Sequence, residues 1–176
     1  MSSAKIPPDL PSPEKLGRRR WGRAQLDQIL DPYKRIAKPK EPSVCSQCGA
    51  AFHKGRWQWL QPLPAEAEKV VCQACHRIND HYPAGILTMT GPIVAAHPDE
   101  ITGLARNQEQ AERAEHPLNR IMSIEQEAPD RLVISTTDIH LPRRIGEAMK
   151  RAYHGEMTEH FDEGGYFVRV NWHREQ

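Results

Sequence analysis

Residues 45–75 read CSQCGAAFHKGRWQWLQPLPAEAEKVVCQAC and contain all four cysteines of the 176-residue chain. The cysteines form two C-x-x-C pairs 23 residues apart, Cys45 with Cys48 and Cys72 with Cys75. A two-residue spacer lets a short turn direct two thiolates at one ion, and two such pairs complete a tetrahedral Cys₄ site. Gly49 follows the first pair, where a turn around a metal needs a positive φ. The spacing predicts a zinc ribbon with Zn²⁺ as its cofactor.

Other uses of these cysteines fit the sequence less well. A thioredoxin-type redox pair needs one C-x-x-C motif at the end of a βαβ unit, which the flanking residues do not provide. A disulfide framework needs an oxidising compartment, yet residues 1–30 hold prolines and arginines rather than an apolar signal segment. A redox switch and an iron–sulfur cluster remain as alternatives to structural zinc. His53, His76 and His81 are alternative ligands, although four thiolates already complete the site.

Charge is distributed unevenly along the chain. Residues 1–82 carry 14 Lys and Arg against 8 Asp and Glu, a net +6, whereas residues 83–176 carry 10 against 15, a net −5. This asymmetry predicts that a polyanion binds to the N-terminal half, and the alternative is that the acidic half only improves solubility. No apolar run approaches the roughly 18 residues of a membrane span. We therefore expect a soluble, cytoplasmic protein with no membrane partner.

Residues 1–42 are predicted to form a disordered basic arm and linker, because they are rich in proline and poor in apolar residues. Within the arm, arginines surround one tryptophan, a combination that suits phosphate pairing and base stacking: Arg18, Arg19, Arg20, Trp21 and Arg23. The alternative is a solvated run of charge whose tryptophan docks on the protein itself.

Residues 43–83 are predicted to be the zinc ribbon. Between its two cysteine pairs, a strand period of two places Trp57 and Trp59 on one face. The two indoles are either a stacking platform for single-stranded nucleic acid or the small core of the ribbon, and we favour the core. Lys54 and Arg56, with Arg77 after the second pair, are then the expected phosphate contacts.

Residues 84–176 are predicted to form an α+β unit with the element order β-α-β-β-α-β of a ferredoxin-like fold. Its strands are expected at residues 85–95, which Gly91-Pro92 interrupts, and at 121–126, 132–136, 157–161 and 166–172. Helices are expected from Pro98 to before Pro117, and from a cap at Thr137 or Asp138 to Gly155. The basic face of the second helix is either solvated or faces RNA.

Two stretches, residues 42–57 (PSVCSQCGAAFHKGRW) and 136–148 (TTDIHLPRRIGEA), resemble an uncharacterised family of small bacterial zinc-ribbon proteins. The likeness extends over residues 31–172. More distantly, the chain resembles the N-terminal part of the nonsense-mediated-decay-type adaptor of the large ribosomal subunit. That adaptor has more zinc knuckles, and here no glycine follows Cys75. The resemblance implies a ribosomal or RNA partner.

Together these observations predict a non-enzymatic zinc protein that binds ribosomal RNA on the large subunit, as an assembly, anti-association or dormancy factor in the stress response. The acidic α+β unit would orient the ribbon or bind a protein partner. The alternative is a zinc-dependent protein-interaction module, or a regulator that responds to oxidation or metal supply. A third hypothesis is an enzyme that uses Asp138 and His140, although no nucleophile or cofactor motif completes such a site.

Overall fold

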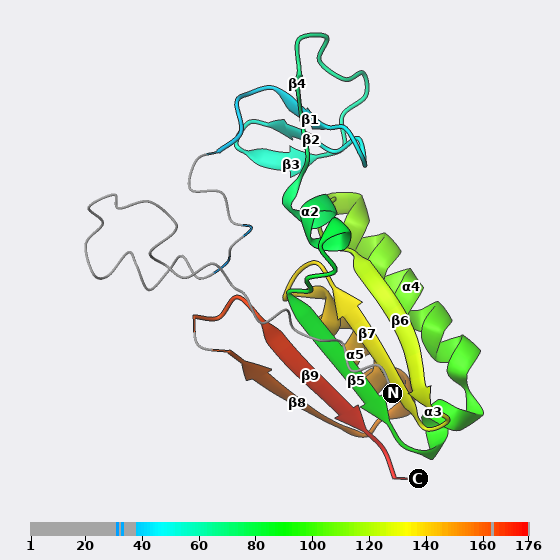
Figure 1. Ribbon diagram of the computed structural model, residues 1–176. Coiled ribbons are helices and arrows are strands. Elements are labelled where there is room, and N and C mark those ends of the chain that lie inside the picture. The colour runs from blue at the N-terminus through cyan, green and yellow to red at the C-terminus, as the bar shows by residue number, and fades with distance from the viewer. Residues whose placement is uncertain (1–30, 32, 34–37, 163, 176) are drawn as a thin grey trace.

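The computed structural model describes residues 31, 33, 38–162 and 164–175. The predictions for the disordered arm, including Arg18, Arg19, Arg20, Trp21 and Arg23, lie outside these residues. Within them the chain is α+β, with a small four-stranded sheet near its beginning and a larger five-stranded sheet after it. Figure 1 shows the small sheet at one end of the large sheet, with a short helix, α2, between them.

The small sheet has the strand order β3-β2-β1-β4, and its strands are β1 (Ser43–Cys45), β2 (Ala51–His53), β3 (Arg56–Gln58) and β4 (Glu68–Val70). Lys54 and Gly55 join β2 to β3 with φ of 52° and 76°. Positive φ at both central residues is typical of the two-residue type I′ turn that matches the twist of a hairpin. The Glu41 carboxylate accepts both backbone N–H groups of this turn, at 2.8 and 2.9 Å, and so fixes its conformation.

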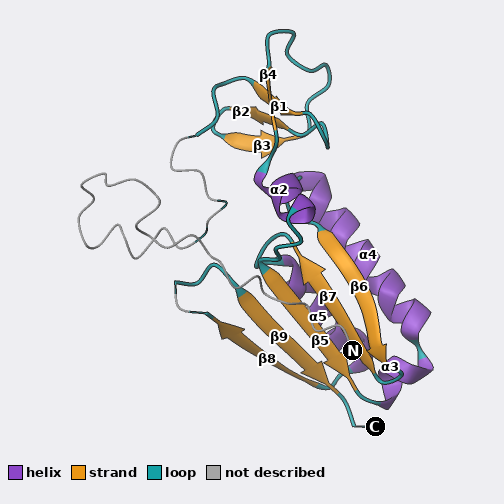
Figure 2. Ribbon diagram, viewed as in Figure 1, coloured by secondary structure: helices purple, strands orange, loops and turns teal. Residues whose placement is uncertain are grey.

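The large sheet has the order β6-β7-β5-β9-β8, with three helices packed on one face (Figure 2). Its strands are β5 (Gly85–Thr90), β6 (Ile121–Ala128), β7 (Arg131–Thr136), β8 (Glu156–Phe161) and β9 (Val168–His173). The helices are α3 (Pro92–Ala96), α4 (Pro98–Glu115) and α5 (Leu141–Tyr153). α2 (Gln73–Asn79) belongs to neither layer and links the two sheets.

The strand order differs from that of a ferredoxin-like sheet at one place. In that fold the strand after the second helix lies directly beside the first strand. Here β8 lies at the edge, and β9 inserts between β8 and β5 and pairs with β5 in parallel. The side chains explain why β9 is internal and β8 lies at the edge, because alternate residues of β9 are fully buried whereas β8 is mostly exposed. The predicted α+β class and the hairpin are confirmed, and all five expected strands join one sheet, but their order is not that of a ferredoxin-like fold.

The core lies between the large sheet and its helices. Trp172 of β9 is the largest fully buried side chain, and its Nε1 donates to the carbonyl of His154 at 2.8 Å. Fully buried aliphatic side chains surround it, among them Leu87, Met89, Ile134, Ile145, Met149 and Val170. Since no cysteine belongs to this cluster, the α+β unit has a core of its own.

Candidate metal centre

The first cysteine pair lies in the turn that follows β1. Cys45 is the last residue of β1, and its backbone N–H donates to the carbonyl of Ala50 at 2.8 Å. Gly49 donates its N–H back to the Cys45 carbonyl at 2.9 Å with φ of +78°. These two bonds close a tight loop that turns the Cys45 and Cys48 thiols to the same side. The positive φ predicted for Gly49 is confirmed.

The second pair comes from the start of a helix rather than from a second hairpin turn. Cys72 is the N-cap residue of α2, and its Sγ accepts the backbone N–H of Cys75 at 3.4 Å. An N-cap side chain normally accepts from the first helical turn, so this thiol also satisfies a helix N–H group. The second ligand pair of the predicted ribbon therefore lies at the start of α2, a helix that the sequence pattern had not indicated.

The four sulfur atoms lie close enough together to bind one metal ion. All four Sγ atoms lie within 4.8 Å of one another, and the Cys45–Cys75 and Cys48–Cys72 sulfurs are 3.7 and 3.8 Å apart. Zinc–sulfur bonds of about 2.3 Å to a tetrahedral ion place the sulfurs about 3.8 Å apart. A disulfide needs about 2.05 Å, and all four cysteines are free thiols. The cluster can therefore hold a metal ion such as zinc.

The cluster is largely closed to solvent. Cys45, Cys72 and Cys75 are at most 4% exposed, whereas Cys48 is half-buried. Trp57 packs against the cysteines and makes an edge-on contact with Phe52, with ring centroids 5.5 Å apart. The prediction that Trp57 belongs to the small core is confirmed. Trp59 lies one residue past β3 and is 40% exposed, so the prediction that it too belongs to the small core is wrong.

Arg120, from the segment between α4 and β6, extends the metal centre beyond the small sheet. The Nη2 atom of its buried guanidinium donates to Sγ of Cys75 at 3.3 Å and of Cys72 at 3.5 Å. Four thiolates around a divalent ion leave a net charge of about −2, which a guanidinium partly neutralises. Leu118, two residues earlier, also packs on the cluster. The α+β unit therefore contributes directly to the cysteine site.

Proton affinity within the cluster follows from these contacts. The hydrogen bond with Cys72 lowers the pKa of the Cys48 thiol to about 4, and the same bond raises the pKa of Cys72. Burial raises the pKa of Cys75, and the hydrogen bond from Arg120 opposes that rise. Burial acts to lower the pKa of Arg120 itself, but the hydrogen bond and charge of Cys75 outweigh it and leave the value raised. A metal bound here would take the place of the thiol protons, because cysteine ligands must be deprotonated.

The residues predicted to contact phosphate have different environments. Lys54 and Arg56 are exposed at the β2–β3 turn. Arg77 is only 3% exposed; its Nη2 pairs with Asp31 at 2.5 Å, and its Nη1 donates to the Tyr82 carbonyl at 3.3 Å. Its guanidinium also lies 4.6 Å from the centre of the Tyr33 ring. Arg77 is therefore corrected from a phosphate contact to an internal anchor, since its donors are directed at the protein itself.

Asp138, which the enzyme hypothesis pairs with His140, directs its carboxylate at the backbone that leads into α5. Oδ2 of Asp138 accepts the backbone N–H groups of His140 and Leu141 at 2.7 and 3.0 Å, as its predicted capping role requires. The N-cap position itself is His140, two residues later than predicted. Burial raises the pKa of the Asp138 carboxyl, and the two backbone hydrogen bonds act against that rise. The carboxylate thus serves the start of α5.

Sequence reasoning did not find Arg120 or the Asp31–Arg77 pair. Arg120 lies 45 residues after Cys75, and Arg77 lies 46 residues after Asp31, so no local spacing indicates either contact. Both contacts depend on how the small sheet packs on the rest of the chain.

In comparisons with family models, with curated proteins and with solved structures, nothing matches this chain. The resemblance to bacterial zinc-ribbon proteins and to the ribosomal adaptor therefore has no support from them, and the metal centre is described from its own geometry. No helix in the described part of the chain is long and apolar enough to cross a membrane.

Proposed function

We propose that this protein is a non-enzymatic, cytoplasmic zinc protein whose metal-folded module binds ribosomal RNA. In this proposal the ion is Zn²⁺, because four thiolates in a closed tetrahedral set are typical of structural zinc. The ion stabilises the small sheet and α2, which together present the binding surface. The role of the metal in this proposal is structural.

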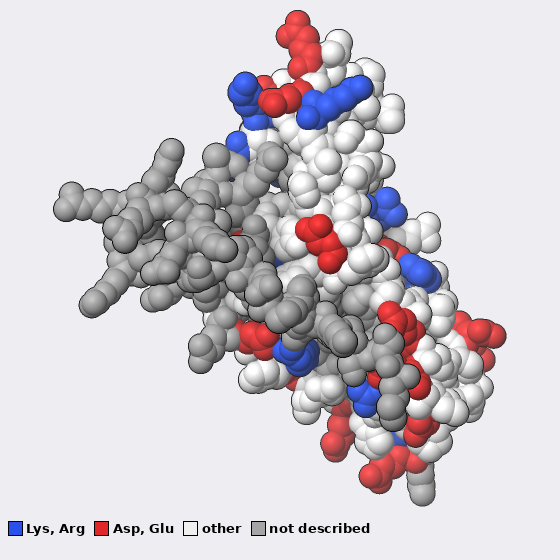
Figure 3. Space-filling model, viewed as in Figure 1, with Lys and Arg blue, Asp and Glu red and all other residues white. Residues whose placement is uncertain are grey.

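The observation that carries the RNA proposal is the contrast between paired and unpaired cations. Five arginines of the α+β unit pair with carboxylates: Arg106, Arg131, Arg143, Arg144 and Arg169. Three other cations of that unit, Arg113, Lys150 and Arg151, pair with no carboxylate of the described chain, so paired cations predominate there without being universal. Five exposed cations of residues 38–69 pair with no carboxylate of the described chain: Lys38, Lys40, Lys54, Arg56 and Lys69. Figure 3 shows Lys and Arg side chains on the small-sheet end of the molecule, interspersed with acidic ones. Unpaired cations are those that phosphates neutralise with release of counterions.

Glu41 is acidic and close to the basic turn, but it forms no ion pair with Lys54 or Arg56. Its carboxylate is used by the N–H groups of Lys54 and Gly55 rather than by a cation. Lys54 and Arg56 therefore have no ion-pair partner in the described chain, and they lie at the tip of a hairpin whose turn is fixed by Glu41. Because the turn backbone is already fixed, only the two side chains have to become ordered when they meet a phosphate. The large ribosomal subunit is the proposed location, with a role in assembly, anti-association or dormancy.

Sucrose-gradient sedimentation of a lysate that contains the tagged full chain tests the proposal. The wild-type protein is expected to migrate with a ribosomal subunit at low salt and to be released at high salt. A Lys54→Ala/Arg56→Ala variant is the specific probe, and a Lys150→Ala/Arg151→Ala variant is the matched control, because both residues are exposed and carboxylate-free. A wild-type protein that stays with free soluble proteins in growing and starved cells overturns the proposal.

One observation favours a second candidate, a redox-responsive or metal-responsive regulator that acts through a protein partner. Cys48 is the one half-buried member of the four cysteines, so it is the thiol that an oxidant reaches first. Oxidation there would release the ion and unfold the module. Zinc release by mild peroxide, from a protein that purifies without nucleic acid, would favour this candidate over RNA binding.

A further inference from the structure

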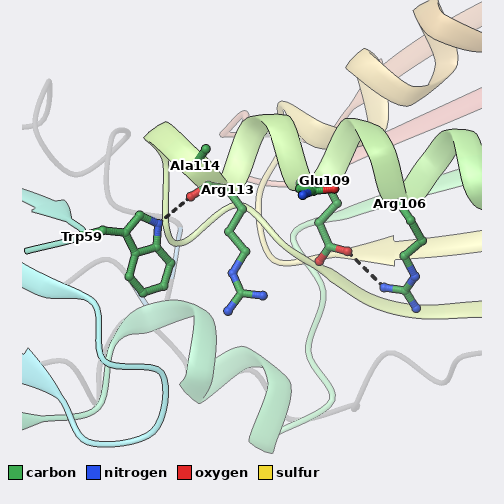
Figure 4. Close-up of a pocket in the computed structure, with 6 residues that line it drawn as sticks. Trp59, Arg106, Glu109, Arg113 and Ala114 are labelled. Atoms are coloured by element: carbon green, nitrogen blue, oxygen red, sulfur yellow. Dashed lines mark hydrogen bonds and ion pairs between the residues drawn. The ribbon is translucent and has the colours of Figure 1, made fainter.

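An exposed tryptophan borders a hollow between the metal module and α4. Trp59 and one face of α4 line this hollow of about 380 Å³ (Figure 4), with Arg106, Glu109, Gln110, Arg113 and Ala114 from the helix. The four helix positions 106, 109, 110 and 113 are spaced by three and four residues, so they share one side of α4. The volume lies within the usual range of small-molecule sites.

Trp59 is held in place although its ring is exposed. Its Nε1 donates to the carbonyl of Arg113 at 2.8 Å. That carbonyl belongs to the last turn of α4, where carbonyl groups have no partner within the helix. The bond satisfies an otherwise unpaired helix group and fixes the plane of the indole. A fixed aromatic face, 40% exposed to solvent, is a ready surface for stacking.

Guanidinium groups border the same hollow. The Arg113 guanidinium lies 5.6 Å from the Trp59 ring, and Arg106 lies seven residues, or about 10 Å, further along α4. Arg106 pairs with Glu109 at 3.0 Å, and Glu109 also accepts the backbone N–H of Ile121 at 2.7 Å. The carboxylate is thus used within the protein, whereas Arg113 has no carboxylate partner in the described chain.

The lining indicates which ligand fits. It offers one flat aromatic face, guanidinium groups and the exposed amide of Gln110, and its only aliphatic residue is Ala114. A lipid or an apolar peptide needs an aliphatic lining, which is missing here. A planar base can stack on the indole, and the phosphate of the same nucleotide can pair with a guanidinium. The edge of the base can form hydrogen bonds with amide and carboxylate groups.

We propose that the hollow formed by Trp59 and α4 is a nucleotide-binding site, in which an unpaired base of single-stranded RNA stacks on Trp59 and its phosphate meets Arg113. This inference extends the proposed RNA-binding function and rests on it. A free mononucleotide carries the same base and phosphate as a nucleotide of RNA. The test therefore includes both ligands, so that binding of RNA can be distinguished from binding of a free nucleotide.

The test uses the zinc-loaded full chain and a fluorescein-labelled oligouridine of about ten nucleotides, followed by fluorescence anisotropy at several salt concentrations. Trp59→Ala is expected to raise the Kd at least about fivefold, since stacking on an aromatic contributes about 1–3 kcal/mol per base. The salt dependence should stay unchanged, because the indole releases no counterion. Trp59→Phe should keep most of the affinity, because it retains an aromatic face.

Arg113→Ala should reduce the slope of log K against log salt by about 0.7, the value for one phosphate contact on a single strand. Phe161→Ala is the matched control. Phe161 is also 40% exposed and has a guanidinium 5.9 Å from its ring, but it lies on β8 and outside the hollow. Circular dichroism and zinc content verify that each variant is folded.

Three other outcomes overturn part of the proposal and separate it from the proposed function. If Trp59→Ala binds oligouridine like the wild type while Lys54→Ala/Arg56→Ala does not, the hollow is not a site but the RNA function stands. If the wild type binds no RNA but binds uridine monophosphate through Trp59, the site stands for free nucleotides and the RNA function fails. If only a labelled oligoglutamate binds through Trp59, the hollow takes acidic peptides and both proposals fail.

Discussion

At the residue scale, Arg120 places a positive charge against two of the four thiols. Arg120→Ala removes it, and we expect metal affinity to fall about 10- to 100-fold, as is usual when a residue supporting the ligands is lost. Competition with a chromogenic chelator gives the affinity, and Arg120→Lys should recover part of it, because lysine keeps the charge but not the forked donors. Arg151→Ala, an exposed cation without a carboxylate partner, is the control. Unchanged affinity in Arg120→Ala would show that the guanidinium only fills space.

Arg77 and Arg56 lie on the same module but differ in what they contact. Arg77→Ala leaves Asp31 without its partner in a largely buried setting, so we expect a loss of about 2 kcal/mol in the free energy of unfolding. Arg56→Ala removes an exposed side chain and should change that free energy by less than about 0.5 kcal/mol. Urea unfolding of both variants checks this. Equal losses would mean that Arg56 also has a structural role.

At the scale of elements, the junction between β5 and α3 depends on Gly91. Its φ is +119°, and a Cβ added there would lie 2.0 Å from the Arg174 carbonyl oxygen. Gly91→Ala should therefore lower the free energy of unfolding by more than about 1 kcal/mol. Gly103→Ala is the opposite control: Gly103 lies inside α4 with open space around its Cα, so alanine should add about 0.5–1 kcal/mol. Thermal melting of the two variants should show shifts of opposite sign.

Proline, acidic and capping residues in the sequence predicted where two helices begin. Pro98 and the acidic first turn mark the start of α4, and the Asp138 cap with Pro142 marks the start of α5. The residues after Thr90 were expected to continue as a strand, but Pro92 in the first turn begins a helix. The position of β9 could not be predicted, because it depends on pairing with β5, more than 80 residues earlier. Cysteine spacing predicted the ligand set, but not that α2 supplies half of it.

At the scale of the whole molecule, the two sheets differ in what stabilises them. The five-stranded sheet has an aliphatic core around Trp172, whereas the small sheet packs mainly on its four cysteines and Trp57. Because the module buries so little apolar surface, we expect it to depend on a bound metal for its folding. Three contacts connect the module to the α+β unit: those of Arg120 and Leu118 with the cysteines, and the hydrogen bond of Trp59. None of these three residues belongs to the core of the α+β unit.

Removal of the metal should therefore unfold one part of the molecule and spare the other. After chelation, hydrogen exchange measured by mass spectrometry should show lost protection over residues 43–79 and retained protection over the strands of residues 85–173. A Cys45→Ser/Cys72→Ser variant should give the same pattern without chelator, because it lacks two ligands. Loss of protection in β5 and β9 as well would contradict the prediction, and would mean that Arg120 makes the two cores a single cooperative unit. In that case the metal would control the fold of the whole chain, and its supply would set the amount of folded protein.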